Sequence, residues 1–177
     1  MALNISPSDD AVLTAVRALL LAILGDGWEV FQGQGNRVPE PAGDNFVVMT
    51  PVHRNRLSTN TVTWDTAAED PTALAHRHDV EIQFQLDIHG PLGADAATTI
   101  AMLLRDDWAV PQLAPAGVAP LYATDGNQLP FINGEHQYEN RWVMTAAFQI
   151  VPTVSTPAEF TASLDATIFP PFGGRFP

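Results

Sequence analysis

The chain has 177 residues, 46 % of them hydrophobic, which predicts one globular domain with a sizeable core and excludes wholesale disorder. Twenty acidic residues oppose eight arginines and no lysine, so the net charge is −12. This balance disfavours general nucleic-acid binding and adhesion to anionic membranes, because both need a surplus of basic side chains. With no cysteine, the sequence excludes disulfides, cysteine-based metal sites and thiol nucleophiles.

The first predicted element is an apolar helix near the start of the chain. Ser6 is expected as its N-cap and Pro7 as its first helical residue, and Gly25 or Gly27 is expected to end it. The apolar run 11–24 has no basic segment before it and is shorter than the ~20 residues that span a bilayer. We therefore predict a buried helix rather than a signal peptide or a membrane span.

The same helix is apolar on nearly every side. A stripe at helical spacing faces the expected core, and on the other sides only Thr14 and Arg17 are polar, among alanines and Leu21. Such a helix needs a second partner besides its own sheet. In a chain this small we expect that partner to be another subunit, with Leu21 in the contact.

Strands are predicted next, at residues 28–31, 46–50 and 59–65, from their content of β-branched and aromatic residues. The strand at 46–50 is apolar enough to be buried on both faces. Pro51 is expected either to stop it or to mark a sheet edge, because proline cannot donate a hydrogen bond to a neighbouring strand.

The clearest pattern is the strict alternation of residues 78–89. Even positions are mostly apolar and odd positions are polar, which predicts a strand of about 40 Å at ~3.3 Å per residue. One face is expected to pack on helices. The other is expected to face water, a channel or a wet interface.

A second helix is predicted at 94–106, followed by an irregular segment at 109–138 that contains several prolines and glycines. A second long strand is predicted at 140–154, and 160–168 is predicted to be a last strand rather than a helix. The fold class is therefore α+β, a mainly antiparallel sheet of long strands flanked by two helices.

A single domain is expected over residues 1–168, and the Pro/Gly/Phe-rich residues 169–177 are expected to form an extended C-terminal arm. Phe172 and Phe176 would be the aromatic anchors of this arm. We include both in the predicted interface with other subunits or partners.

A metal-dependent hydrolase is the alternative that the histidines offer. His76 and His78 lie two residues apart and Asp79 is adjacent, which is acceptable spacing for metal ligands on a strand. No known metal motif completes the set, and no nucleophile elbow or phosphate-binding loop is present. We therefore predict no enzyme, no metal and no cofactor.

Cationic residues are concentrated between residues 37 and 56. Arg37, Arg54 and Arg56 fall in this stretch, and they predict either salt bridges to a neighbouring subunit or contacts with DNA phosphates. A solvated hairpin with pairs inside the chain is the simpler interpretation. Of the two functional readings we favour salt bridges between subunits, because three arginines cannot offset the surrounding negative charge.

Several segments carry a family resemblance that extends over residues 6–168. They are the stretch 37–41 (RVPEP), the stretch 46–60 (FVVMTPVHRNRLSTN), His89-Gly90-Pro91, Leu104-Arg105-Asp106, Arg141-Trp142 and Val151-Pro152-Thr153-Val154. Together they resemble the phage neck terminator protein family. The residues after Ile168 have no match in this pattern.

The resemblance implies a structural virion protein, assembled in the host cytoplasm and located at the junction of neck and tail. Its subunits would form a ring, generally a hexamer, that caps the tail tube and joins it to a head-completion adaptor. DNA would pass through the ring without specific binding, and the negative charge suits a channel wall that repels phosphates. A monomeric binding module that grips a ligand with residues 109–138 is the remaining alternative.

Overall fold

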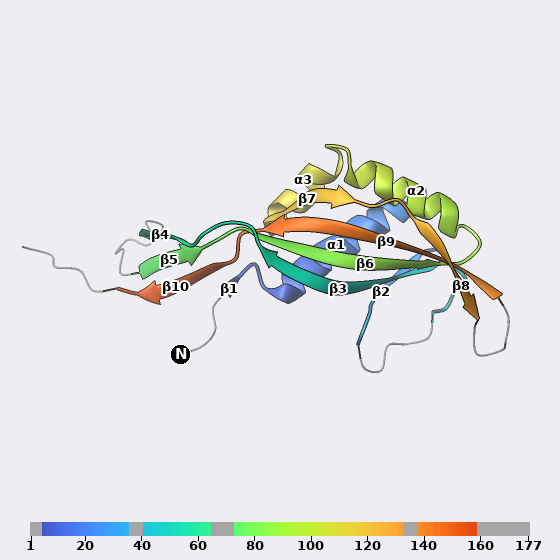
Figure 1. Cartoon of the computed structure of the whole chain (residues 1–177), viewed down its shortest axis with the longest axis horizontal. Helices are drawn as coiled ribbons and strands as arrows, with labels where there is room; N and C mark the ends of the chain where they lie inside the picture. Colours follow the sequence, from blue (N-terminus) through green and yellow to red (C-terminus); the bar gives the residue numbers. More distant parts are fainter. Residues whose placement is uncertain (1–4, 36–40, 65–72, 133–137, 159–177) are drawn as a thin grey trace, which may run out of the picture.

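The computed structural model describes residues 5–35, 41–64, 73–132 and 138–158 (Figure 1). In chain order the elements are β1 (Ile5–Ser6), α1 (Asp9–Leu24), β2 (Glu29–Gln32), β3 (Phe46–Arg56), β4 (Thr61–Trp64), β5 (Ala73–Arg77), β6 (Val80–His89), α2 (Gly93–Leu104), α3 (Ala109–Leu113), the 3-10 turn η1 (Ala114–Ala116), β7 (Val118–Ala123), β8 (Asn127–Ile132), β9 (Tyr138–Ile150) and β10 (Thr153–Pro157).

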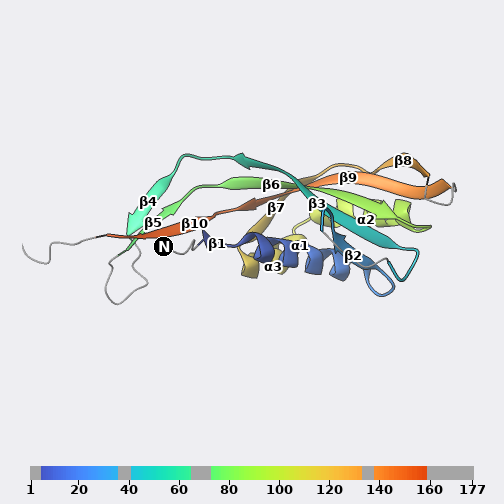
Figure 2. The same ribbon diagram turned by 90° about the horizontal axis from the view of Figure 1, so that it is seen from below.

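In the described part of the chain the strands form two sheets. The main sheet has the order β2-β3-β6-β9-β7, and β8 pairs with the first part of β9, which β7 leaves free. Of these strand pairs, only β2 and β3 run parallel. The second sheet has the order β1-β10-β5-β4. We call it the projecting sheet, because it extends beyond the end of the helix layer (Figures 1 and 2).

The helices cover one face of the main sheet (Figure 2). From α1, the side chains of Val12, Val16, Leu19 and Leu20 are buried against it. The central strand β6 contributes the even-numbered residues of its alternating pattern, including Phe84, whose ring meets Phe148 of β9 edge to face at 5.8 Å. The α+β class and the mainly antiparallel sheet are therefore confirmed, with the short α3 added to the two predicted helices.

Helix α1 begins two residues later than predicted. Ser6 belongs to β1, where it pairs with Thr153, and Pro7 precedes the helix. Ser8 is the actual N-cap, and its hydroxyl accepts a hydrogen bond from the N–H of Ala11. The prediction for the other end is confirmed, since Gly25 is the C-cap with a positive φ of 75°.

Pro51 does not stop the strand that begins at Phe46. β3 continues to Arg56, with a register shift against β6 between Pro51 and His53. β2 pairs only with Phe46–Met49, so among the described strands the outer edge of β3 is open from Thr50 onward. The missing N–H of proline costs no hydrogen bond there, which confirms the alternative that Pro51 marks a sheet edge. The beginning of β3 is fully buried on one face only, at Val47 and Met49.

The prediction of an irregular segment at 109–138 is wrong for most of its length. It contains α3, η1, β7 and β8, and only residues 133–137 lie outside the described part of the chain. Prolines favour breaks in regular structure, but here they are accommodated within it. Pro120 lies within β7 and Pro130 lies within β8. Among the described strands, each of these two pairs only with β9 and is therefore an edge strand, where proline is tolerated.

The strand predicted at 140–154 is divided between the two sheets. β9 ends at Ile150, and β10 starts at Thr153 in the projecting sheet. Similarly, the pattern at 78–89 begins only at Val80, and β5 precedes it as a strand that we did not predict. The strand predicted at 160–168 and the arm at 169–177 lie outside the described residues.

Candidate interaction surfaces

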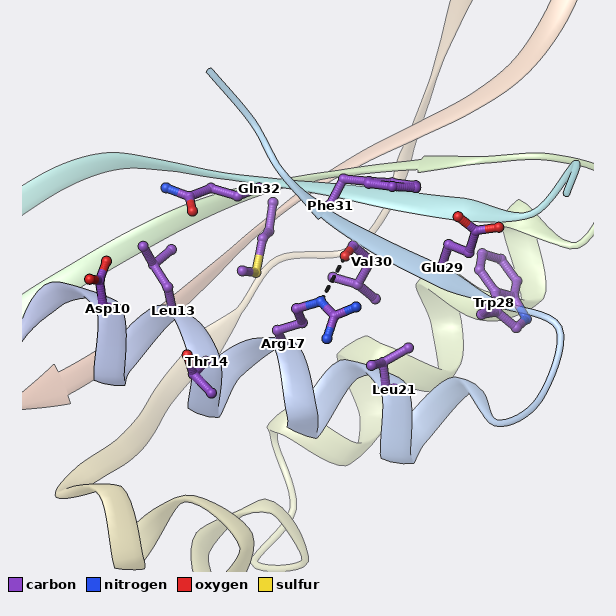
Figure 3. Close-up of a pocket in the computed structure, with 11 residues that line it drawn as sticks. Asp10, Leu13, Thr14, Arg17, Leu21, Trp28, Glu29, Val30, Phe31 and Gln32 are labelled. Carbon is purple, nitrogen blue, oxygen red and sulfur yellow. Dashed lines mark hydrogen bonds between the residues drawn. The ribbon is translucent and has the colours of Figure 1, made fainter. Parts of the chain in front are cut away.

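A cleft of about 680 Å³ runs between α1 and β2 (Figure 3). Its floor is apolar, and its charged groups are the carboxylates of Asp10 and Glu29 and the guanidinium of Arg17. Arg17 donates a hydrogen bond from Nε to the carbonyl oxygen of Val30 at 2.9 Å, which ties the helix to β2. The lining residues are Asp10, Leu13, Thr14, Arg17, Leu21, Trp28, Glu29, Val30, Phe31, Gln32 and Met49.

Leu21 lies in this cleft and is half-buried, packed in part against the core. The opposite flank of α1 carries Ala11, Ala18 and Ala22, whose side chains are exposed. The apolar outer sides of α1 are therefore not fully covered by described residues of this chain. The expectation that Leu21 contacts another subunit stays a prediction.

The arginines of the predicted cluster have different surroundings. Arg54, on β3, forms an ion pair with Asp9 at 2.5 Å, and these side chains are 47 % and 70 % exposed. Arg56 is exposed at the end of β3. Arg37 lies outside the described residues, as do Phe172 and Phe176. Arg54 therefore has a partner inside its own chain, and a contact of this cluster with a second subunit stays a prediction.

The projecting sheet has two different faces. Ile5, Val154, His76 and Val62 are directly paired across its four strands, so their side chains lie on one face, and Leu74 and Trp64 follow two residues further along. The opposite face carries serines and threonines together with Arg77, alanines and Pro157. The apolar face includes several side chains that are about half exposed: Ile5 at 41 %, Val62 at 52 %, Trp64 at 49 % and Val154 at 36 %.

The face of the main sheet away from the helices carries a chain of polar contacts along β6. Near its start, Glu81 accepts hydrogen bonds from Gln83 and from the hydroxyl of Tyr122. These two donors lower the pKa of Glu81 below its ordinary value of 4.5. Hydrogen bonds with Ser58 and Gln149 lower the pKa of Asp79 in the same way. Both groups are therefore carboxylates at neutral pH.

Further along the same face, charged groups are paired within the chain. Asp87 is 7 % exposed and accepts hydrogen bonds from Nε and Nη2 of Arg141 at 3.0 and 2.6 Å. His89 is also 7 % exposed, bonds Glu139 at 2.9 Å and stacks on Phe46. The odd-numbered residues of β6 thus form a polar face as predicted, but toward its end the side chains satisfy each other rather than face water.

The residues of the alternative metal site, His76, His78 and Asp79, do not form a set of ligands, although both histidines line one hollow. His76 Nε2 lies 2.8 Å from the hydroxyl of Thr156, and Asp79 accepts a hydrogen bond from Gln149. His78 lies in the break between β5 and β6. No group of three or more histidine, aspartate or glutamate side chains in the described ranges could hold a metal ion. Within these same ranges, no helix is both long and apolar enough to cross a membrane.

The comparison with known families shows which family this chain belongs to. The profile of the phage neck terminator proteins matches residues 10–170. The chain belongs to the phage neck terminator protein family. The resemblance found in the sequence motifs is thereby confirmed.

A solved structure shares the fold of this family member. It is the sheath/tube terminator of an extracellular contractile injection system in its extended state, with a TM-score of 0.51 and 12 % identity. The match covers 95 % of this chain and 65 % of that one, so this chain spans about two thirds of the length of its structural relative. No curated protein matches the sequence.

The sequence predicted one strand of the projecting sheet, because β4 (Thr61–Trp64) lies within the predicted strand 59–65. It did not predict the sheet itself, since each of its strands has five residues or fewer. Such short stretches carry too little periodicity to show which strands they pair with.

Proposed function

We propose that this chain is the subunit of a homo-oligomeric ring, a hexamer, that closes the tail tube at the phage neck and joins it to a head-completion adaptor. The observation that carries the proposal is the family match over residues 10–170. The exposed apolar surfaces support it, because a ring subunit must offer one patch to each of its two neighbours. The cleft beside α1 and the apolar face of the projecting sheet are two such patches, at different places on the chain.

The wall of the channel is the second part of the proposal. We infer that its lumen is acidic. Carboxylates on the channel wall would repel the phosphates of the DNA, so that the DNA slides past without being held. The net charge of −12 per subunit supports this inference. The polar face of the main sheet has suitable carboxylates in Asp79 and Glu81, which stay ionised at neutral pH.

A phage that lacks the gene for this chain tests the proposed function. We expect full heads and free tails that do not join, and recovery of joined particles when the gene is supplied in trans. Cryo-electron microscopy of the recovered particles would then show a ring of this chain between the tail tube and the head connector. Joined, infectious particles without the chain would contradict the proposal, and an inner wall rich in arginine would contradict the acidic lumen.

A further inference from the structure

The apolar face of the projecting sheet is the continuation of the face that the helices cover in the main sheet. Ile150, Pro152 and Val154 lie at alternate positions along β9 and β10, and the first two are buried while Val154 is 36 % exposed. The sheet runs past the start of α1, and no described helix lies beneath its outer part (Figure 2). A half-apolar sheet exposed in this way lacks the second layer that buries such a face elsewhere.

The base of this face carries an arginine and two histidines. A hollow of about 290 Å³ lies where the projecting sheet leaves the main sheet, and its charged or titratable lining groups are Arg54, His76 and His78, with no carboxylate among them. Arg54 also pairs with Asp9 of its own chain, and both side chains of this pair stay largely exposed. A partner that matches it would present apolar side chains with carboxylates at their border.

The cleft beside α1 has those properties. Its lining is apolar at Leu13, Leu21, Trp28 and Phe31, among others, and it has the carboxylates of Asp10 and Glu29. The guanidinium of Arg17 is directed to the carbonyl of Val30 by its hydrogen bond. The two surfaces of one chain are thus both apolar, and the carboxylates of the cleft suit the exposed arginine at the border of the projecting sheet.

We propose that the apolar face of the projecting sheet of one copy packs on the α1–β2 cleft of the next copy. Both surfaces are present on every subunit, so the same head-to-tail contact repeats from copy to copy and closes into a ring when the rotation per subunit allows it. This inference rests on the proposed ring and adds the residues that join its subunits. Leu21 then lies in the contact, together with Val62 and Val154.

Cross-linking between chains that each carry one cysteine tests the contact, and the absence of native cysteine makes each introduced thiol unique. Val62→Cys chains and Thr14→Cys chains are supplied together to the phage that lacks the gene, and the particles are treated with a flexible bis-maleimide. Thr14 is exposed and lines the cleft. Because each chain has one thiol, a 62–14 product can form only between copies.

We expect a 62–14 cross-link in these particles. We expect none when Met102→Cys, on the exposed side of α2, replaces Thr14→Cys as the partner. Joined particles that contain the chain but give no 62–14 product would overturn the contact and leave the proposed function standing. Cross-linking of position 62 to another tail protein instead would also overturn the contact. The contact would likewise be overturned if the thiol of Val62→Cys were protected from maleimide in the isolated monomer, because the face would then be covered without a second copy. Particles that join without the chain would overturn both.

Two matched substitutions on β4 give a second test. Val62 and Thr63 are neighbours with exposed side chains on opposite faces of the projecting sheet. Val62→Glu places a charge in the proposed contact, and we expect the yield of joined particles to fall by about tenfold or more. Thr63→Glu adds the same charge to the other face and is expected to keep the wild-type yield. Equal yields for the two variants would contradict the proposal.

Discussion

Asp87 is a buried charge whose partners come from the same sheet. It is held by the guanidinium of Arg141 on β9, and Gln85 also donates to it at 2.9 Å. Removal of Arg141 leaves a carboxylate that is 7 % exposed without its counter-charge. We expect Arg141→Met to lower the free energy of unfolding by about 3 kcal/mol, measured by urea denaturation.

Arg77 provides the control for this variant. It is exposed on β5, and Arg77→Met is expected to change the stability by less than about 0.5 kcal/mol. If Arg141→Met were as mild as the control, the pair with Asp87 would contribute nothing to the fold.

Glu81 gives a prediction for the dependence of stability on pH. Hydrogen bonds from Gln83 and Tyr122 lower its pKa from 4.5 in the folded chain. Its contribution is therefore fully present above pH 4.5 and is lost as the pH falls through the lowered pKa. In thermal melts we expect wild type to be more stable than Glu81→Gln at neutral pH, with the difference shrinking below pH 4.5. A difference that stays constant with pH would contradict this.

At the scale of elements, Gly90 controls how β6 passes into α2. Its φ is +105°, and a Cβ at this position would lie 2.3 Å from the carbonyl oxygen of Asp44. The turn therefore needs glycine both for its backbone angle and for the close approach of the loop before β3. We expect Gly90→Ala to destabilise the chain by about 2 kcal/mol in thermal melts.

The matched control is Gly43→Ala in that same loop. A Cβ there would meet nothing within 4 Å, so little change is expected. If the two variants melted alike, the turn would be less tightly packed than its geometry requires.

At the scale of the whole molecule, the arginines of β3 can be tested as a contact between parts of the particle. We expect the double variant Arg54→Glu, Arg56→Glu to block the joining of heads and tails while the subunit stays folded, because reversal of two charges repels an acidic partner. The readouts are the titre of infectious particles and the circular dichroism of the purified chain.

Arg54 also pairs with Asp9 in its own chain, so Asp9→Asn is the necessary control. This variant removes the internal pair and leaves both arginines positive. It is expected to join heads and tails at the wild-type yield, because an exposed pair adds only about 0–1 kcal/mol to stability. If Asp9→Asn were as defective as the double variant, the arginines would act inside the subunit rather than between subunits.

Part of this fold could be predicted because its information is local. The period-two pattern of residues 80–89 and the helical stripe of α1 each extend over several repeats, so the elements and their buried faces followed from the sequence. The prediction failed where the pattern was short or contained proline. Pro51, Pro120 and Pro130 all lie within strands, and a proline is tolerated there where no neighbouring strand requires a backbone N–H at that position.

The sequence by itself determined the fold class, the central strand, the first helix and the family. It could not determine that the strands after residue 57 and residue 150 leave the main sheet and form a second one, with an apolar face that no described helix covers. That outcome depends on pairing between segments as distant as Ile5, Val154, His76 and Val62. Only the tertiary structure decides such pairing, because the energy of a sheet lies in contacts between strands and not within any one of them.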